Sequence, residues 1–154
     1  MTAARILVAA VLLAALTATA AGQYGTVTRV TDGDTVRFAP AGGGSTLSVR
    51  LAGIDAPEIC QAWGPQAREA LQHKTAGRTL RLLVTARDRF GRTLGTLHWG
   101  RYDLNRRMVA EGHAWSARGM FHVEQDSARS ARLGLHADQS AVRPDEFRRA
   151  HGNC

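Results

Sequence analysis

The sequence predicts an α+β fold, in which five strands form a small β-barrel and three helices pack at its base. Two observations lead to this prediction. Five short segments alternate apolar and polar residues, as half-buried strands do, and three segments have helical spacing. The strand segments are 26–31, 35–38, 47–51, 79–85 and 93–99, and the helical segments are 64–76, 104–111 and 122–133. A length of 154 residues favours a single domain.

Turn residues bound the first three strands. The β-branched segment 26–31 ends at Asp32-Gly33, a pair that is common in turns. A glycine-rich loop, 40–45, connects the second segment to the third. Pro57 ends this region, because proline has no N–H to donate to a strand ladder. The three segments therefore form a meander of short strands.

The remaining elements are defined by caps and turns. Pro65 suits the first turn of the first helix, and Gly77 suits its C-terminal end. In the fourth strand one face is expected to carry Leu80, Leu82 and Val84, and the polar turn 86–92 leads into the fifth strand.

Two further helices complete the chain before its tail. Asp103 is a suitable N-cap for the second helix, and Gly134 follows the third. The tail 137–154 has little periodicity apart from the run 146–150. Five strands with a helix between the third and fourth are compatible with a closed barrel of the OB type.

The first twenty residues have the composition of a signal peptide. Arg5 precedes the apolar run 6–16, and Ala18-Thr19-Ala20 matches an A-x-A cleavage site. This run is too short to span a bilayer, which takes about 20 apolar residues. An uncleaved anchor is the alternative. We expect a mature chain that begins near Ala21 and resides in the periplasm or outside the cell.

Export would place the two cysteines in an oxidising compartment, where an even number usually indicates a disulfide. Cys60 follows Glu58 by two residues, and Cys154 is the last residue of the sequence. A Cys60–Cys154 bridge would tie the tail 137–154 to the segment behind Glu58. Two free thiols or an intermolecular link are the alternatives.

The charge of the chain favours a polyanionic partner. The sequence has 20 Lys and Arg against 13 Asp and Glu, a formal net charge of +7, and Lys74 is the only lysine. Arginine binds phosphate more directionally than lysine does. A solvated, arginine-rich surface would give the same composition, so charge alone does not identify the partner.

Three carboxylates and an arginine occur within 25 residues of one another. A hairpin would fold Asp34 back towards Asp55, with Arg50 and Glu58 on the same stretch. Converging carboxylate oxygens suit Ca²⁺ or Mg²⁺, and a guanidinium beside them suits a phosphate. The alternative is that Asp32 and Asp34 only form a turn. Together these groups indicate a site that hydrolyses phosphodiesters.

At three motifs in order, the sequence resembles the staphylococcal nuclease (thermonuclease) family. They are Asp-Gly-Asp-Thr at 32–35, Arg-Leu-x-Gly-Ile-Asp-x-Pro-Glu at 50–58, and Asp-x-Phe-Gly-Arg at 88–92. The resemblance covers roughly residues 24–134, most of the mature chain. It implies a five-stranded OB barrel with three helices and a nuclease domain over 23–136.

The resemblance also implies roles for individual residues. Arg50 and Arg92 would bind the scissile phosphate, and Glu58 would act on the attacking water. Asp34, Asp55 and the backbone carbonyl of Ala56 would hold one Ca²⁺ ion. For the substrate itself, the resemblance suggests contacts from Arg89, Phe90 and Arg118.

One departure from the family concerns base stacking. The family's best-known member has tyrosines after the second helix, where this sequence has Arg118 and Met120. Phe90 also stands where relatives often have tyrosine. Stacking of a base on an aromatic ring contributes about 1–3 kcal/mol. We therefore expect weaker or less base-selective binding that depends more on charge.

Together, these arguments predict an exported, Ca²⁺-dependent nuclease that cleaves DNA and RNA with little sequence specificity and leaves 3′-phosphate ends. We expect a monomer without stable membrane association. The alternatives are a non-catalytic OB module that binds nucleic acid or another polyanion, and a secreted interaction protein.

Overall fold

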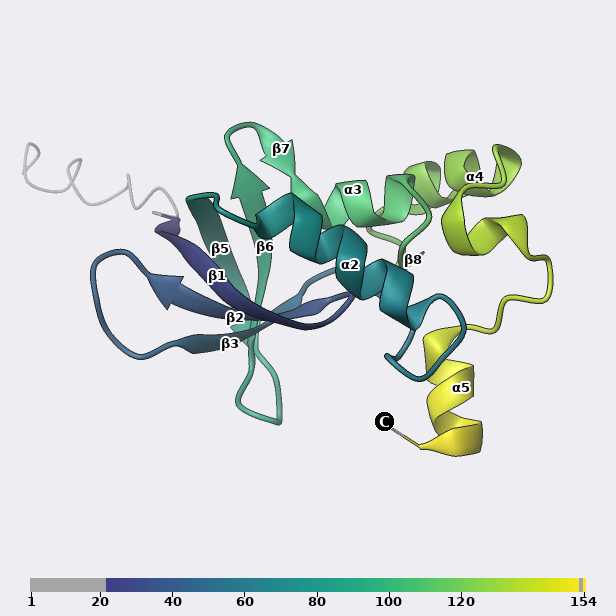
Figure 1. The fold of residues 1–154 in the computed structure, drawn as a ribbon, viewed down its shortest axis with the longest axis horizontal. Coiled ribbons are helices and arrows are strands. Elements are labelled where there is room, and N and C mark those ends of the chain that lie inside the picture. The colour runs from purple at the N-terminus through teal and green to yellow at the C-terminus, as the bar shows by residue number, and fades with distance from the viewer. Residues whose placement is uncertain (1–21, 153) are drawn as a thin grey trace, which may run out of the picture.

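A computed structural model describes residues 22–152 and 154 (Figure 1). The predicted signal peptide and its cleavage site lie outside the described residues. Within them, no helix is long and apolar enough to cross a membrane. The described elements, in chain order, are β1 (Gln23–Asp32), β2 (Thr35–Pro40), β3 (Leu47–Leu51), β4 (Ile54–Asp55), α2 (Gly64–Thr75), β5 (Leu80–Arg87), β6 (Thr93–Trp99), β7 (Tyr102–Asp103), α3 (Leu104–Ala110), β8 (Trp115–Ser116), α4 (His122–Ser130), the 3₁₀ turn η1 (Gly134–Ala137) and α5 (Pro144–His151).

Five strands close a barrel, which confirms the predicted architecture. The sheet order is β3-β2-β1-β5-β6-β7, and an additional pairing of β3 with β6 closes the ring. That pairing is parallel and aligns Arg50 with Leu94, whereas the pairings around the rest of the barrel are antiparallel. Closure leaves no free edge on these five strands.

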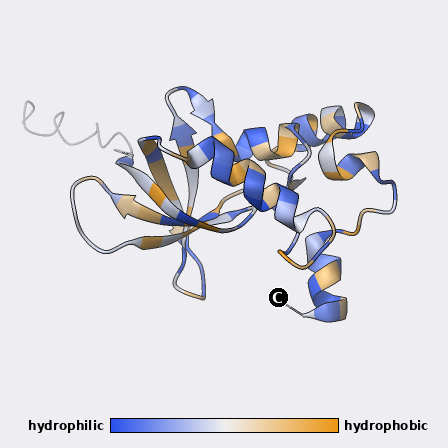
Figure 2. Cartoon of the chain, viewed as in Figure 1, coloured by the Kyte–Doolittle hydropathy of each residue, from blue (hydrophilic) through white to orange (hydrophobic). Residues whose placement is uncertain are grey.

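The core fills the barrel and continues under the helices. Fully or almost fully buried side chains from β2, β3, β5 and β6 are Val36, Phe38, Val49, Leu51, Leu80, Leu82 and Leu97. Leu71 of α2 and Met108 of α3 belong to the same cluster. α2 crosses the base of the barrel in Figure 1. In Figure 2, apolar and polar colours alternate along the strands, and the loop between β5 and β6 is largely hydrophilic.

One prediction about the core is wrong. Val84 was expected to share the buried face of Leu80 and Leu82, but its side chain is 54% exposed. The strand register shifts between Val84 and Ala86, and the residues from Val84 to Arg87 extend as an arm that is exposed on both faces. Because both faces of this arm are exposed, alternation of apolar and polar residues there does not indicate which side chains are buried.

Residues 22–152 contain one α-helix more than the three predicted. α2, α3 and α4 lie where they were expected, although α4 ends at Ser130 and not at 133. The fourth, α5, spans Pro144–His151 and includes the weak run 146–150. It lies apart from α3 and α4, beside the loop that leads from β4 into α2 (Figure 1). The tail therefore adds a structured element to the side of the barrel that carries Glu58.

Candidate active site

Strand pairing places Asp34 beside the segment that carries Asp55. Thr35 pairs with Arg50 across β2 and β3, and the Leu51 N–H donates to the Asp34 carbonyl at 2.7 Å. The Asp34 side chain accepts from the Ala56 N–H at 2.7 Å and from the Thr35 hydroxyl at 3.0 Å. Asp34 and Asp55 are both buried. The predicted convergence of Asp34 and Asp55 is therefore present.

Glycine at position 33 permits this close approach. A Cβ at Gly33 would lie 2.6 Å from the Ala56 Cβ and 2.7 Å from the Ala67 Cβ. Asp32, the preceding residue, accepts from the Asp34 N–H at 3.1 Å. Burial raises the pKa of Asp32, although the Arg50 charge opposes this shift. Asp32 thus has the turn role considered from sequence and also lines the site.

Arg50 connects the two aspartates. Its Nη1 lies against Asp34 Oδ2, and its Nη2 donates to Asp55 Oδ1 at 2.8 Å. The side chain is only 17% exposed. Burial lowers the pKa of Arg50, whereas Asp55 and Asp32 raise it. Because an arginine keeps its proton in proteins, the site holds a fixed positive charge between two carboxylates.

A cavity of about 640 Å³ opens over these groups. Its lining combines carboxylates with four arginines from distant parts of the chain: Asp32, Asp34, Thr35, Arg50, Ala56, Glu58, Arg89, Phe90, Arg92 and Arg148. A polar cavity rich in guanidinium groups suits an anionic ligand.

The turn between β5 and β6 supplies Arg92. Asp88 accepts from the N–H groups of Phe90 and Arg92, each at 2.9 Å, and from Arg92 Nε at 2.7 Å. Burial would raise the pKa of Asp88, but the hydrogen bonds from Arg92 and Phe90 outweigh it and lower that pKa. A charged carboxylate therefore fixes both the turn and the Arg92 side chain.

The predicted substrate residues fall in two places. Arg89 and Phe90 line the cavity; the Phe90 ring is 69% exposed, and the Arg89 guanidinium lies 4.8 Å from its centre. Arg118 is exposed and is not among the lining residues. It follows β8, in which Trp115 pairs with Asp55 and Ser116 with Ile54, so the chain reaches Arg118 by moving away from Asp55.

Glu58 lies at the cavity with a partner that sequence reasoning missed. Arg148 Nη1 donates to Glu58 Oε1 at 2.8 Å and to Asp55 Oδ1 at 3.2 Å, and its Nη2 donates to Asp55 Oδ2 at 2.9 Å. The hydrogen bonds that Arg148 donates, those to Asp55 foremost, raise the pKa of Arg148 above its ordinary value. The one signal in the sequence was Cys154, whose bridge to Cys60 brings the tail to Glu58.

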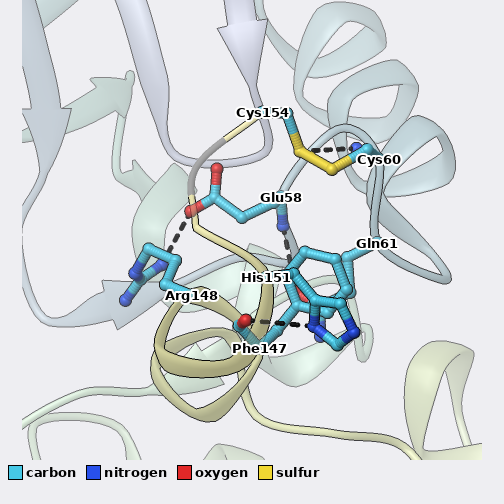
Figure 3. Close-up of a disulfide and its surroundings, with 7 residues drawn as sticks. All are labelled: Glu58, Cys60, Gln61, Phe147, Arg148, His151 and Cys154. Carbon is cyan, nitrogen blue, oxygen red and sulfur yellow. Dashed lines mark hydrogen bonds and ion pairs between the residues drawn. A yellow bond between two sulfur atoms is a disulfide. The ribbon is translucent and has the colours of Figure 1, made fainter.

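That bridge is present. Cys60 and Cys154 form a disulfide with their Cα atoms 6.0 Å apart, and the Cys60 N–H lies 3.1 Å from Cys154 Sγ. Figure 3 shows the bridge beside Glu58 and the last turn of α5. The predicted pairing is confirmed, and it joins residues 94 positions apart.

The donor set fits a hard divalent cation. One oxygen each of Asp34 and Asp55 contacts the single Arg50 guanidinium, and both Asp55 oxygens also accept from Arg148, so a cation bound by the two carboxylates would replace some of these arginine contacts. Among residues 22–152 and 154, no three His, Cys, Asp or Glu side chains gather in the manner of a metal cluster. The remaining ligands would have to be the Ala56 carbonyl and water. An all-oxygen set of this kind suits Ca²⁺ or Mg²⁺.

Comparison with known proteins agrees with this geometry. A family profile described as staphylococcal nuclease homologue matches residues 48–138. A protein named micrococcal nuclease from Shigella flexneri is 37% identical over 167 aligned positions, which cover 97% of this chain and 94% of that protein.

Two further relatives are named as uncharacterized endonucleases. The one from Haemophilus influenzae is 34% identical over 80% of this chain and 71% of its own length. The one from Escherichia coli O157:H7 is 33% identical over 79% of this chain and 82% of its own length. With the barrel, the cavity and these matches together, the chain belongs to the staphylococcal nuclease family and is a hydrolytic endonuclease.

Proposed function

We propose that the protein is an exported, Ca²⁺-dependent nuclease that hydrolyses DNA and RNA with little sequence specificity and leaves 3′-phosphate ends. One observation carries this proposal. Arg50 and Glu58, from the segment 50–58, and Arg92, from the turn between β5 and β6, line one cavity together with Asp34. The cavity is large enough for a phosphodiester and its neighbouring sugars, and its guanidinium groups match phosphate oxygens.

The two arginines stabilise the charge that develops on the phosphate. Attack on a phosphodiester increases negative charge on its non-bridging oxygens. Arg50 is held by Asp34 and Asp55, and Arg92 is held by Asp88. Because both guanidinium groups are fixed before substrate binds, little reorganisation is needed during the reaction.

Glu58 orients the attacking water and accepts its proton. Its carboxylate lies at the cavity and is held by Arg148 through Oε1. A carboxylate within hydrogen-bond reach of water next to the phosphate can serve as a general base. A bound Ca²⁺ would supply Lewis-acid stabilisation of the phosphate, with Asp34, Asp55 and the Ala56 carbonyl as the residues that would hold it.

The cavity supports the proposed lack of sequence specificity. Apart from Thr35 and Ala56, its lining consists of charged groups and one exposed aromatic ring, Phe90. Charged groups bind the backbone, which is the same at every position, and an exposed ring stacks on any base. Binding of this kind supports the use of both DNA and RNA.

Export is proposed from the predicted signal peptide and from the disulfide. The Cys60–Cys154 bridge fits an oxidising compartment, because such bonds are rare where thiols are kept reduced. We propose that the mature chain begins near Ala21, is a monomer and resides in the periplasm or outside the cell.

The experiment incubates the disulfide-bonded mature chain with plasmid DNA and with RNA, each in Ca²⁺ and in chelator. The Arg50→Ala/Arg92→Ala variant is tested beside Arg37→Ala/Arg101→Ala, which removes two exposed arginines outside the cavity. We expect Ca²⁺-dependent cleavage by the wild type and the control variant, and none by the cavity variant. Products should support extension by a polymerase only after phosphatase treatment. A gel shift without cleavage would instead favour the non-catalytic binding module.

A further inference from the structure

Helix α5 brings an arginine from the end of the chain into contact with two groups of the site. Arg148 contacts Glu58 and Asp55 through three hydrogen bonds of 2.8–3.2 Å. Its side chain is 30% exposed and lines the same cavity as Arg50 and Arg92. The contact with Glu58 joins residues 90 positions apart.

Two tethers hold α5 in this place, and both start from the segment just after Glu58. Before the helix, Gln61 Nε2 donates to the Val142 carbonyl at 2.7 Å. After the helix, the Cys60–Cys154 disulfide closes the tail. Figure 3 shows Glu58, Gln61 and Cys60 on one side of α5, with Arg148 directed at Glu58. Arg148 and Glu58 are thereby fixed relative to one another.

The contact leaves part of Glu58 available for chemistry. Arg148 binds Oε1, and Figure 3 shows the second carboxylate oxygen of Glu58 outside this contact. The planar guanidinium also spans both oxygens of Asp55. Each carboxylate oxygen has two lone pairs, so a hydrogen bond from Arg148 does not exhaust its capacity.

We propose that Arg148 is a positioning residue of the nuclease site, and that α5 and the Cys60–Cys154 disulfide are the parts of the fold that hold it there. The proposal rests on the proposed function for its reaction. Arg148 sets the orientation of the Glu58 carboxylate and its placement relative to Asp55. Since a displacement of about 1 Å in a catalytic group can cost about a hundredfold in rate, loss of this contact lowers turnover.

This role has a signature that distinguishes it from the alternatives. Removal of a positive charge beside Asp55 does not weaken the attraction of the site for a cation, because like charges repel. Loss of Arg148 should therefore leave Ca²⁺ affinity unchanged or higher, while turnover falls because Glu58 is no longer positioned. A latch that blocks the site would give faster turnover on removal, and a purely structural residue would lower stability, Ca²⁺ affinity and turnover together.

The first experiment compares Arg148→Gln with Arg149→Gln in the full mature chain. Arg149 is the next residue of the same helix, but it is 72% exposed and pairs with Asp145 of α5. We expect Arg148→Gln to lower kcat about tenfold to a hundredfold at an unchanged KM. Its Ca²⁺ dissociation constant by calorimetry should not rise, and its Tm should stay within about 5 °C of the wild type. Arg149→Gln should match the wild type.

A conservative variant tests the geometry of the contact. Lysine carries the charge but cannot span two carboxylates as a planar guanidinium does. Arg148→Lys should therefore recover only part of the lost kcat. Full recovery would overturn the positioning role, because charge alone would then suffice.

The second experiment tests the tether with a double-mutant cycle. The Cys60→Ser/Cys154→Ser variant should reproduce most of the fall in kcat, because α5 then has no covalent link and is held near Glu58 only by the hydrogen bonds of Gln61 and of Arg148 itself. Addition of Arg148→Gln to this variant should lower kcat by less than about threefold more, since coupled residues are non-additive. Fully additive losses would overturn the link between the disulfide and Arg148.

The outcomes separate this inference from the proposed function. A wild-type chain that leaves nucleic acid intact overturns the proposed function and this role with it. An active wild type with an unchanged or faster Arg148→Gln variant overturns the role of Arg148 alone. So does a variant that loses Ca²⁺ affinity and stability along with turnover.

Discussion

Two walls of the cavity hold their charged groups by different means. The barrel wall is the side formed by Asp34 and Arg50, and the tail wall is the side formed by Arg148 of α5. On the barrel wall, the pairing of Thr35 with Arg50 sets the distance between Asp34 and the Asp55 segment, and buried hydrogen bonds reinforce it. On the tail wall, Arg148 comes from a short helix that is linked to the segment after Glu58 by one disulfide and by the Gln61 hydrogen bond, besides the hydrogen bonds of Arg148 itself. The barrel wall is thus part of the folded core, whereas the tail wall depends on a covalent link.

The largest effect is expected at Glu58, where the two walls meet. Glu58→Gln keeps the shape of the side chain but removes its basicity. We expect kcat to fall by about a hundredfold to ten-thousandfold, the range for loss of a general base, with Ca²⁺ affinity unchanged. Single-turnover cleavage and calorimetry measure the two quantities. Glu69→Gln, an exposed residue of α2, is the control, and an equal loss there would remove Glu58 from the mechanism.

The folded core behind the barrel wall should be the part of the molecule where a substitution most lowers stability. Asn105 is fully buried; it donates to the carbonyls of Ala52 and Gly95 and accepts from the Leu97 N–H. Asn105→Leu leaves these backbone groups without that partner and should lower the free energy of unfolding by about 3 kcal/mol. Urea denaturation measures this change. A loss as small as that expected for Arg148→Gln would contradict the contrast between the walls.

A smaller effect is expected at Asp88, which holds Arg92 within its own turn. Asp88→Asn keeps the side-chain length but weakens the charge-assisted contact with Arg92 Nε. We expect kcat/KM to fall about tenfold through loss of orientation, with little change in Tm. If Asp88→Asn were as damaging as Arg92→Ala, Asp88 would have a role beyond orientation.

The smallest effect is a pH dependence of stability on the helical side of the molecule. Burial, with a nearby Lys74 or Arg129 charge, lowers the pKa of His113 and His136. A base whose pKa is lower in the folded state binds protons more readily when unfolded. The contribution of the neutral His113 and His136 to the free energy of unfolding is therefore complete above the ordinary histidine pKa of about 6.5, and it declines as the pH falls below that value.

Urea midpoints from pH 8 to pH 5 test this dependence. His113→Gln/His136→Gln should flatten the decline in the free energy of unfolding. His73→Gln, an exposed histidine of α2, should leave it as in the wild type. A steeper decline in the double variant would mean that the two pKa shifts have the opposite sign.

The barrel wall was predictable because its signals are local. Asp34, Arg50, Asp55 and Glu58 lie within one meander, so strand alternation and a hairpin suffice to bring them together. The same reasoning failed at Val84, where the strand leaves the core and alternation loses its meaning.

The tail wall was only half predictable. The two cysteines predicted that the tail returns to Glu58, and the disulfide confirms it. Nothing in the weak run 146–150 indicated which side chain would face the site, because orientation depends on a long-range link and on the phase of a short helix. Arg118 differs, because its predicted contact with substrate came from the resemblance alone. The pairing of β4 with β8 directs the chain that leads to Arg118 away from Asp55.

The central claim is that Asp34 and Asp55 hold the Ca²⁺ that supports cleavage at Arg50, Arg92 and Glu58. Its most direct test measures the Ca²⁺ dissociation constant by calorimetry and the Ca²⁺ concentration for half-maximal cleavage, in the wild type and in Asp55→Asn. We predict that the two values agree within about twofold and rise together by at least about tenfold in the variant, since carboxylate ligands set Ca²⁺ affinity. Cleavage that persists in chelator, or a Ca²⁺ dependence that Asp55→Asn leaves unchanged, would contradict it.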